Sequence, residues 1–248
     1  MKHLISSRPR SGLSILLAAG MTLAGCAAPI NPVGDGAIND PYEARNRQVH
    51  DFNKRLAGSG TGGVASRVPP EVQHLVHNIA DNLAMPQMAV NSLLQGDLAD
   101  TGIAVSRFAV NSVVGIGGLI DVAGEFGVRD VETDFGETLH VWGVGEGAYL
   151  ELPVIGPSTQ RDAAGRVVDL FTNPLTYVLD SPERYVGPLA SIADRVFKTS
   201  RRGDVIDDVL NNSADSYAQA RLIYLQKRRY ELSRATATEL EYDDPYAN

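Results

Sequence analysis

The thiol of Cys26 is the side chain whose surroundings most clearly specify a chemical reaction, and it is the only thiol in the 248 residues. Cys26 ends the sequence Leu-Ala-Gly-Cys at positions 23–26. Three basic residues lie within the first ten positions, and an uncharged, mostly apolar segment occupies residues 13–23. This order is typical of a secretory signal, and its ending is typical of a bacterial lipoprotein signal. We therefore expect cleavage between Gly25 and Cys26, followed by lipidation of Cys26.

The alternative interpretation is a secreted protein with an unmodified cysteine. It is less favoured, because the four residues up to Cys26 and the segment before them would have to agree by chance. Each buried methylene of a lipid contributes about 0.8 kcal/mol, and one acyl chain anchors a protein only reversibly. Three chains are expected here, which makes attachment stable. Ala27 and Ala28 follow the cysteine, without an aspartate that indicates inner-membrane retention, so we expect the outer membrane, facing the periplasm.

Two glycine-rich runs are further candidates for chemistry, because glycine loops can hold phosphate groups. They are Gly115-Ile116-Gly117-Gly118 and the run from Gly143 to Gly147. Neither is expected between a strand and a helix, and no Gly-Lys-Ser/Thr sequence follows either run. We interpret both runs as turns.

Histidines suggest a metal site only weakly. His74, His77 and Asp81 share one helix face by their spacing, which makes a zinc site conceivable. The sequence His-Glu-x-x-His is absent, and no nearby segment supplies a further ligand. A solvated polar face is the favoured interpretation. Since a Gly-x-Ser-x-Gly elbow is also absent, we expect no enzyme, no cofactor and no metal.

Charge argues against nucleic acid as a partner. The formal net charge is −8, and removal of residues 1–25, with three cations and no acid, makes it −11. The length suits one domain or two, with a sizeable buried core. The 24 glycines and 13 prolines cluster, which favours many turns between helices.

The first part of the chain is predicted to form a tether, a helix and a linker. Residues 26–39 have no apolar periodicity and are expected to be a lipidated tether. A helix is predicted from Asp40-Pro41 to about Leu56, with Asp40 as its cap and Pro41 in its first turn. Residues 57–63 are then a flexible linker rich in Gly, Ser and Thr.

A second helix is predicted to begin at Pro70, where apolar residues recur at helical spacing. Pro86 is expected to kink it and Gly96 to end it. Asp97 is expected to cap the following helix.

Thirteen consecutive residues without a charge, Phe108–Ile120, lie between Arg107 and Asp121. A membrane-spanning helix needs about 20 apolar residues, so this segment is too short to cross alone. Its three glycines predict a helix–turn–helix hairpin. A buried core hairpin and a membrane-associated hairpin remain equally weighted alternatives.

The remaining chain predicts loops and then helices. Residues 134–162 are rich in Gly and Pro, and predict loops with one short strand or hairpin near Tyr149–Leu152. Helices are expected at about 161–170, 188–197 and 204–234, the last long and amphipathic. Residues 236–248 are expected to be an acidic, disordered tail.

Several blocks of these segments occur in the order found in one known family. The blocks are Asp40-Pro41-x-Glu43-x-x-Asn46-Arg47 with Phe52-Asn53, Asn91-x-x-Leu94-Gln95-Gly96-Asp97, Arg107-Phe108-x-x-Asn111-x-x-x-Gly115-x-Gly117-Gly118-x-x-Asp121-x-Ala123, Asp134-Phe135-Gly136-x-Thr138-Leu139, Gly143-x-Gly145-x-Gly147-x-Tyr149-x-x-Leu152-Pro153, Gly156-Pro157-Ser158-x-x-Arg161-Asp162, and Tyr217, Arg221 and Tyr224. Over residues 40–230 the chain therefore resembles the MlaA (VacJ) family of outer-membrane lipoproteins. His140 stands where that family usually has glycine.

The resemblance implies a mainly α, ring-shaped helical lipoprotein (residues 40–235) embedded in the outer membrane around a central channel. It implies removal of mislocalised phospholipids from the outer leaflet and their transfer to a soluble periplasmic carrier, which feeds an inner-membrane ABC transporter. A trimeric outer-membrane porin is the expected neighbour, and lipid asymmetry is the expected result.

The site residues expected on this basis form two sets. One set borders the channel, and the other belongs to an N-terminal helix lying against the membrane. They are Phe108, Asn111, Val113, Val114, Gly115, Ile116, Gly117, Gly118, Leu119 and Ile120 for the channel, and Pro41, Asn46, Arg47, Phe52 and Asn53 for the helix. Two alternatives remain, a non-transporting scaffold that bridges envelope proteins through its C-terminal helix, and a lipid-anchored periplasmic enzyme.

Overall fold

The computed structural model describes residues 38–56, 67–201 and 213–236. Residues 1–39 and 40–248 form two separate units, and the description below concerns the second. The predicted signal peptide, Cys26, the predicted linker 57–63 and residues 237–248 lie outside the described residues, as does the predicted tether except for its last two positions.

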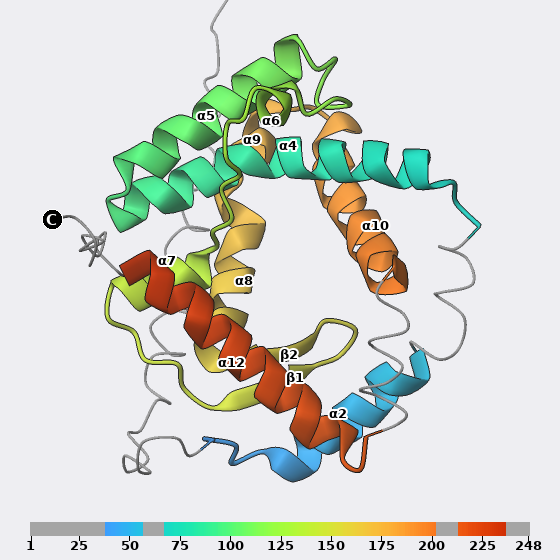
Figure 1. The fold of residues 1–248 in the computed structure, drawn as a ribbon. Coiled ribbons are helices and arrows are strands. Elements are labelled where there is room, and N and C mark those ends of the chain that lie inside the picture. The colour runs from blue at the N-terminus through green and yellow to red at the C-terminus, as the bar shows by residue number, and fades with distance from the viewer. Residues whose placement is uncertain (1–37, 57–66, 202–212, 237–248) are drawn as a thin grey trace, which may run out of the picture. The chain divides into compact units, whose positions relative to one another are not determined.

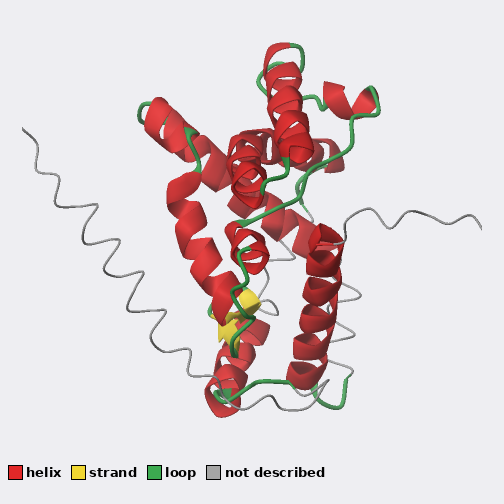
Figure 2. Cartoon of the chain, turned by 90° about the vertical axis from the view of Figure 1, so that its left-hand side faces the viewer, coloured by secondary structure: helices red, strands yellow, loops and turns green. Residues whose placement is uncertain are grey.

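The second unit is mainly helical, as predicted (Figures 1 and 2). Two short strands are the only strands among the described residues. The elements in chain order are α2 (Glu43–Leu56), α4 (Pro70–Gln95), α5 (Leu98–Val113), α6 (Val122–Glu125), α7 (Phe135–Val141), β1 (Tyr149–Leu152), β2 (Gly156–Thr159), α8 (Gln160–Thr172), α9 (Leu175–Val178), the 3-10 helix η2 (Glu183–Tyr185), α10 (Val186–Arg201) and α12 (Ser216–Thr236).

Helix α4 begins and ends where its local signals predict. Pro70 occupies the first turn, and Gly96 adopts a left-handed conformation (φ 82°) whose N–H donates to the Leu93 carbonyl. The helix continues through Pro86 without interruption. Asp97 then caps α5 by accepting from the Asp100 N–H at 2.8 Å, as predicted.

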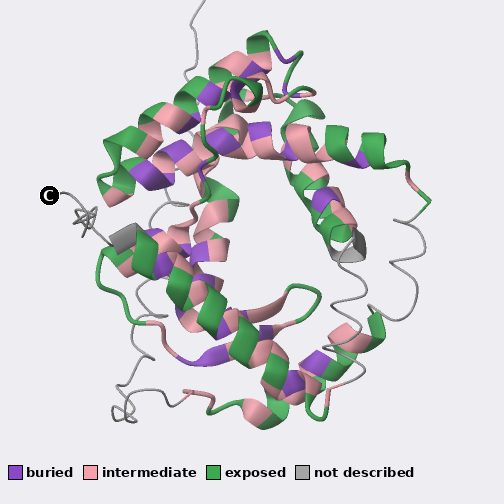
Figure 3. Cartoon of the chain, in the orientation of Figure 1, coloured by how far each residue is buried: buried purple, intermediate pink, exposed green. Residues whose placement is uncertain are grey.

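The hydrophobic core lies between α4 and α5. Its buried members include Met85 and Ala89 on α4, Ala104 on α5 and Val131 in the loop between α6 and α7, and Phe108 packs against them (Figure 3). Full burial of a side chain as large as Met85 contributes about 1.5–3 kcal/mol. The core therefore fixes α5, and with it the start of the uncharged segment.

Strands β1 and β2 form an antiparallel hairpin, which confirms the prediction near Tyr149. The register pairs Tyr149 with Thr159 and Leu152 with Gly156. The expectation of loops before it is wrong in one place, because α7 forms there. Asp134 caps α7 by accepting from the Glu137 N–H at 2.8 Å, and this cap outweighs the glycines nearby.

The predicted helical hairpin within Phe108–Ile120 needs a correction. Helix α5 ends at Val113, residues 114–120 form a turn, and the next helix, α6, is only four residues long and begins after Asp121. The segment is thus the end of one helix and a turn, because three successive positive φ angles leave no room for a second helical arm. No helix among the described ranges is both long and apolar enough to cross a membrane.

Two helix starts also differ from the prediction. Helix α2 begins at Glu43, and Asp40 is used in contacts with α12 instead of as a cap. Residues 213–215 are not helical, so α12 begins at Ser216, where Asp215 accepts from the Ala218 N–H. The earlier part of the predicted C-terminal helix, 204–212, lies outside the described residues.

Candidate functional site

The turn formed by residues 114–120, called the glycine turn below, is held by its own backbone. Ile116, Gly117 and Gly118 have φ angles of 56°, 71° and 90°. The N–H groups of Gly117 and Gly118 donate back to the Ser112 and Asn111 carbonyls, each at 2.9 Å. Two of the three positions carry glycine, for which this conformation has no steric cost, whereas β-branched Ile116 is strained there.

Close packing explains why positions 115 and 118 require glycine. A Cβ on Gly115 would lie 2.2 Å from the Ile120 carbonyl oxygen and 2.5 Å from that of Asn111. A Cβ on Gly118 would lie 2.6 Å from the Asn82 side chain of α4. Asn78 of the same helix donates to the Leu119 carbonyl at 2.9 Å. The glycine turn therefore packs closely against α4, and positions 115 and 118 have no space for a larger residue.

A buried arginine fixes the base of the glycine turn. Arg107 is 3% exposed and donates to the Asp121 carboxylate at 3.0 and 3.2 Å and to the Val128 carbonyl. Asn111 donates to Asp121 and accepts from the Ala123 N–H. Burial alone raises the pKa of Asp121, but hydrogen bonds from Asn111 and Gly124 and the charge of Arg107 lower it overall. Asp121 is thus a charged cap for α6.

The tip of the glycine turn, together with Val113 at the end of α5, is apolar and solvent-exposed. Val113 is 82% exposed and Ile116 67%, and Val114 and Ile120 are exposed as well. Of the predicted channel residues, Phe108 and Asn111 face inward instead, one toward the core and one toward Asp121. The structure therefore separates this set into an internal base and an exposed tip.

The predicted residues of the N-terminal helix mostly make internal contacts. Asn46 is buried, donates to the Tyr149 carbonyl and accepts from the Glu151 N–H. Asn53 bonds the backbone of Leu152 and Val154 at 2.9 and 2.7 Å. These amides fasten α2 along β1.

The remaining members of this set differ from the amides. Arg47 binds both Asp215 oxygens at 2.8 and 3.0 Å and lies over the Tyr217 ring. Phe52 is half exposed, and Pro41 is exposed in the turn before α2. Phe52 and Pro41 are therefore the members of the set with apolar surface to offer a membrane.

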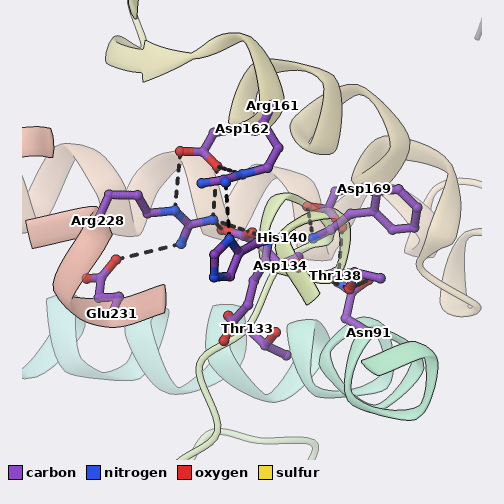
Figure 4. Close-up of polar contacts among 12 residues, drawn as sticks. Asn91, Thr133, Asp134, Thr138, His140, Arg161, Asp162, Asp169, Arg228 and Glu231 are labelled. Carbon is purple, nitrogen blue, oxygen red and sulfur yellow. Dashed lines mark hydrogen bonds and ion pairs between the residues drawn. The ribbon is translucent and has the colours of Figure 1, made fainter. Parts of the chain in front are cut away.

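A second polar region links α12 to α7 and α8 (Figure 4). Arg228 of α12 donates to Asp134, the cap of α7, at 2.6 Å, and to Asp162 of α8 at 3.2 Å. Tyr224 donates to the same Asp162 carboxylate. We call Asp134, Asp162, Tyr224 and Arg228 the α12 cluster. Burial alone raises the pKa of Asp162, but the charge of Arg228 and the Tyr224 hydrogen bond lower it overall.

Sequence reasoning missed the α12 cluster as a unit. Asp162 pairs with Arg228 of α12 at 3.2 Å. The partners are 66 residues apart, and Asp134 and Arg228 are 94 residues apart, so no local spacing connects them. A helix cap at Asp134 was the available signal.

The histidine pattern does not assemble a metal site. His77 lies 3.3 Å from Asp194 of α10, whereas Asp81 lies 3.9 Å from Arg107, and His74 is exposed. Within the described ranges, no group of three His, Cys, Asp or Glu side chains is placed to hold a metal ion.

Known proteins are similar to this chain in sequence and in fold. The family model for the MlaA lipoprotein matches residues 38–231. The intermembrane phospholipid transport system lipoprotein MlaA of Escherichia coli (strain K12) is 32% identical over 225 residues, covering 86% of this chain and 86% of the relative. An uncharacterised protein of Rickettsia bellii is 36% identical over 197 residues, covering 77% and 76%.

One solved structure is also similar, from work on the structural basis for maintenance of bacterial outer membrane lipid asymmetry. Its TM-score is 0.67 at 32% identity, with 78% of this chain and 98% of the solved chain covered. The match of one family model to most of the chain decides the assignment: the chain belongs to the MlaA lipoprotein family.

Proposed function

We propose that this protein is an outer-membrane lipoprotein that removes mislocalised phospholipids from the outer leaflet and hands them to a periplasmic carrier. The observation that carries the proposal is the fold similarity over 98% of a chain solved in the context of outer-membrane lipid asymmetry. Relatives named as intermembrane phospholipid transport lipoproteins, in Escherichia coli and Haemophilus influenzae, support the same role.

A ring with a central channel is part of the proposal. Neighbouring elements make contact in the succession α10, α4, α7, α12 and β2, and α2 contacts β1, the partner of β2. Within the second unit these elements follow one another along a curve (Figure 1), which is the arrangement expected of a ring. The glycine turn is proposed to border the channel.

Exposed apolar surface supports contact with a membrane. On α10, Val186, Leu189, Ile192 and Val196 recur at helical spacing on one face, and all four are exposed. Exposed apolar side chains that gather on one face of a helix are typical of surfaces that contact a membrane or a partner. We infer that these side chains contact lipid, and that lipidated Cys26 provides a second attachment.

A channel through such a body lowers the cost of moving a lipid headgroup. Crossing about 30 Å of hydrocarbon leaves polar groups unsatisfied, at several kcal/mol each. Polar side chains inside an apolar exterior offer these groups partners. The protein itself is proposed to be no enzyme and to need no cofactor, and the energy comes from the ATPase of the inner-membrane transporter. The trimeric porin and the soluble carrier are the proposed protein partners.

Charged substitutions at the tip of the glycine turn test the proposal. Val114→Asp and Ile116→Asp place a carboxylate on exposed apolar surface, so the fold should survive while lipid removal fails. We expect cells with either variant to lose resistance to detergent and chelator, with the protein still present in the membrane. Val114→Thr, of nearly the same shape without a charge, is the matched control. Normal resistance in both Asp variants would contradict the role of the tip.

A non-transporting scaffold remains the second candidate. It would act through α12, but Arg221, Arg228 and Arg229 of that helix all pair with acids of this chain. Unchanged outer-leaflet phospholipid in cells lacking the protein would favour the scaffold.

A further inference from the structure

A pocket of about 530 Å³ lies beside the C-terminal half of α12 and apart from the glycine turn. The loop Gly143–Glu146 forms one side, and α12 forms another through Arg229 and Leu232. His140 and Arg161 also line it. The volume is within the range of sites that bind small molecules, about 300–1,000 Å³.

Arg161 is a buried arginine with unused hydrogen-bond donors. It is 5% exposed, and its Nη1 lies 3.3 Å from His140 Nδ1 and 3.4 Å from the Val144 carbonyl. Its Nε and Nη2 atoms have no hydrogen-bond partner among the described residues. Buried polar groups are nearly always paired, so two free donors on one guanidinium indicate a missing acceptor.

The carboxylates near Arg161 are held by other cations. Asp162 lies 3.5 Å from Arg161 Nε without hydrogen-bond geometry, and it accepts from Arg228 instead (Figure 4). It also accepts from Tyr224. Glu146 accepts two hydrogen bonds from Arg229 at 2.9 and 3.0 Å. Burial, and then the charge of Arg161, lower the pKa of His140, which favours the neutral form of its ring. The positive charge of Arg161 is therefore incompletely matched.

A guanidinium with free donors is suited to an oxyanion. Its planar fork matches two oxygens of a phosphate group, and such charge-assisted hydrogen bonds are roughly twice as strong as neutral ones. Leu232 supplies apolar surface in the same pocket, where the carbon atoms attached to such a group can lie.

We propose that this pocket binds a phosphate group through Arg161, either that of a phospholipid headgroup or free inorganic phosphate. The assignment to a headgroup rests on the function proposed above, whereas binding of free phosphate does not.

The test measures binding to the full-length lipidated protein in a non-ionic detergent by titration calorimetry. One arm uses inorganic phosphate, and the other uses dihexanoyl phosphatidylglycerol below its micelle concentration. We expect saturable binding of at least one probe. Arg161→Gln should weaken it about tenfold or more, and Arg161→Lys less, because Lys keeps the charge without the fork.

A second pair of variants avoids the buried arginine, in case Arg161→Gln fails to fold. Val144 lies half exposed at the pocket, and its backbone carbonyl lies 3.4 Å from Arg161 Nη1. Val144→Glu adds a repelling carboxylate and should weaken binding about tenfold, whereas Val144→Gln, of the same size, should weaken it far less.

Binding of either probe that Val144→Glu weakens and Val144→Gln spares supports the pocket, and the probe bound identifies the source of the phosphate. Binding of neither probe, or equal affinities in all variants, overturns it. Outer-leaflet phospholipid in cells lacking the protein is measured separately. If it stays normal while inorganic phosphate still binds, the transport proposal fails and the pocket stands.

Discussion

The glycine turn and the α12 cluster share one structural feature. In each, an arginine of a long helix pairs with an aspartate that caps a short helix, Arg107 with Asp121 at α6 and Arg228 with Asp134 at α7. The surroundings differ. On the N-terminal side of Asp121 the chain forms the exposed tip with Val114 and its apolar neighbours, whereas Arg228 also reaches buried Asp162. The arginine–aspartate pair fixes the position of the short helix in each region. The residues next to the pair determine whether the region presents an apolar or a charged surface to a ligand.

Backbone strain is also distributed unequally. Ile116, at φ 56°, is held left-handed at the tip of the glycine turn. Near the α12 cluster the positive φ angles of 84° and 74° belong to Gly143 and Gly147, which adopt them without strain. Since strained non-glycine residues concentrate at functional sites, the glycine turn is the better candidate for a working surface.

The largest expected effect comes from removing Arg228. Arg228→Met leaves Asp162 buried with its main cation gone, and we expect a loss of about 3 kcal/mol in the free energy of unfolding. Arg107→Met should cost less, because Asp121 is more exposed and keeps Asn111. Denaturant unfolding measures both. Lys227→Met is the control, since Lys227 is 70% exposed and its loss should cost about 0.5 kcal/mol or less. Equal losses for positions 227 and 228 would contradict the buried cluster.

The next effect separates close packing from backbone conformation within the glycine turn. Gly115→Ala forces a Cβ against two carbonyl oxygens, so we expect a loss of about 2 kcal/mol in stability. Gly117→Ala meets open space and has only the cost of its φ of 71°, about 1 kcal/mol. Thermal unfolding of the two variants compares these costs. The packing account fails if Gly117→Ala is the more damaging change.

A smaller effect of opposite sign is expected at the tip. Asn tolerates the left-handed conformation, so Ile116→Asn should raise the free energy of unfolding by about 1 kcal/mol. It also removes apolar surface, so lipid removal should weaken while stability increases. Denaturant unfolding and detergent resistance, measured on the same variant, test whether stability increases while lipid removal decreases. Lower stability would mean that Ile116 packs instead of being strained.

The smallest effect concerns acid. The pKa of Asp162 is lowered below its ordinary value of 3.8, so its contribution to stability is complete above about pH 5 and is lost as the pH falls below 3.8. Arg228→Met removes much of this lowering. We expect the wild-type protein to lose more stability than the variant between pH 5 and 3, measured by denaturant unfolding. Parallel curves would show that Arg228 does not set this pKa.

Local signals predicted much of the fold, because they act within a few residues. Pro70, Gly96 and Asp97 marked the ends of two helices correctly, and the hairpin near Tyr149 was also correct. Helix α7 was missed because glycines around it favoured loops, although Asp134 caps it. The second arm of the predicted helical hairpin was wrong because glycines 117 and 118 turn the chain instead of starting a helix.

The candidate site was harder to predict from the sequence than the fold. Exposure of the tip of the glycine turn follows from packing of α5 on α4, which no pattern within the segment contains. The α12 cluster joins residues up to 94 positions apart, and acidic residues are too frequent in this chain to single out Asp134 and Asp162. The free donors of Arg161 depend on what Asp162 bonds elsewhere, which only the folded structure reveals.

The most direct test of the central proposal is the amount of phospholipid in the outer leaflet of cells that produce Val114→Asp, Val114→Thr or the wild-type protein in place of the deleted gene. We predict that phospholipid accumulates with Val114→Asp as it does in the deletion strain, and stays at the wild-type level with Val114→Thr. Wild-type levels with Val114→Asp, at equal amounts of protein in the membrane, would contradict a lipid path along the glycine turn.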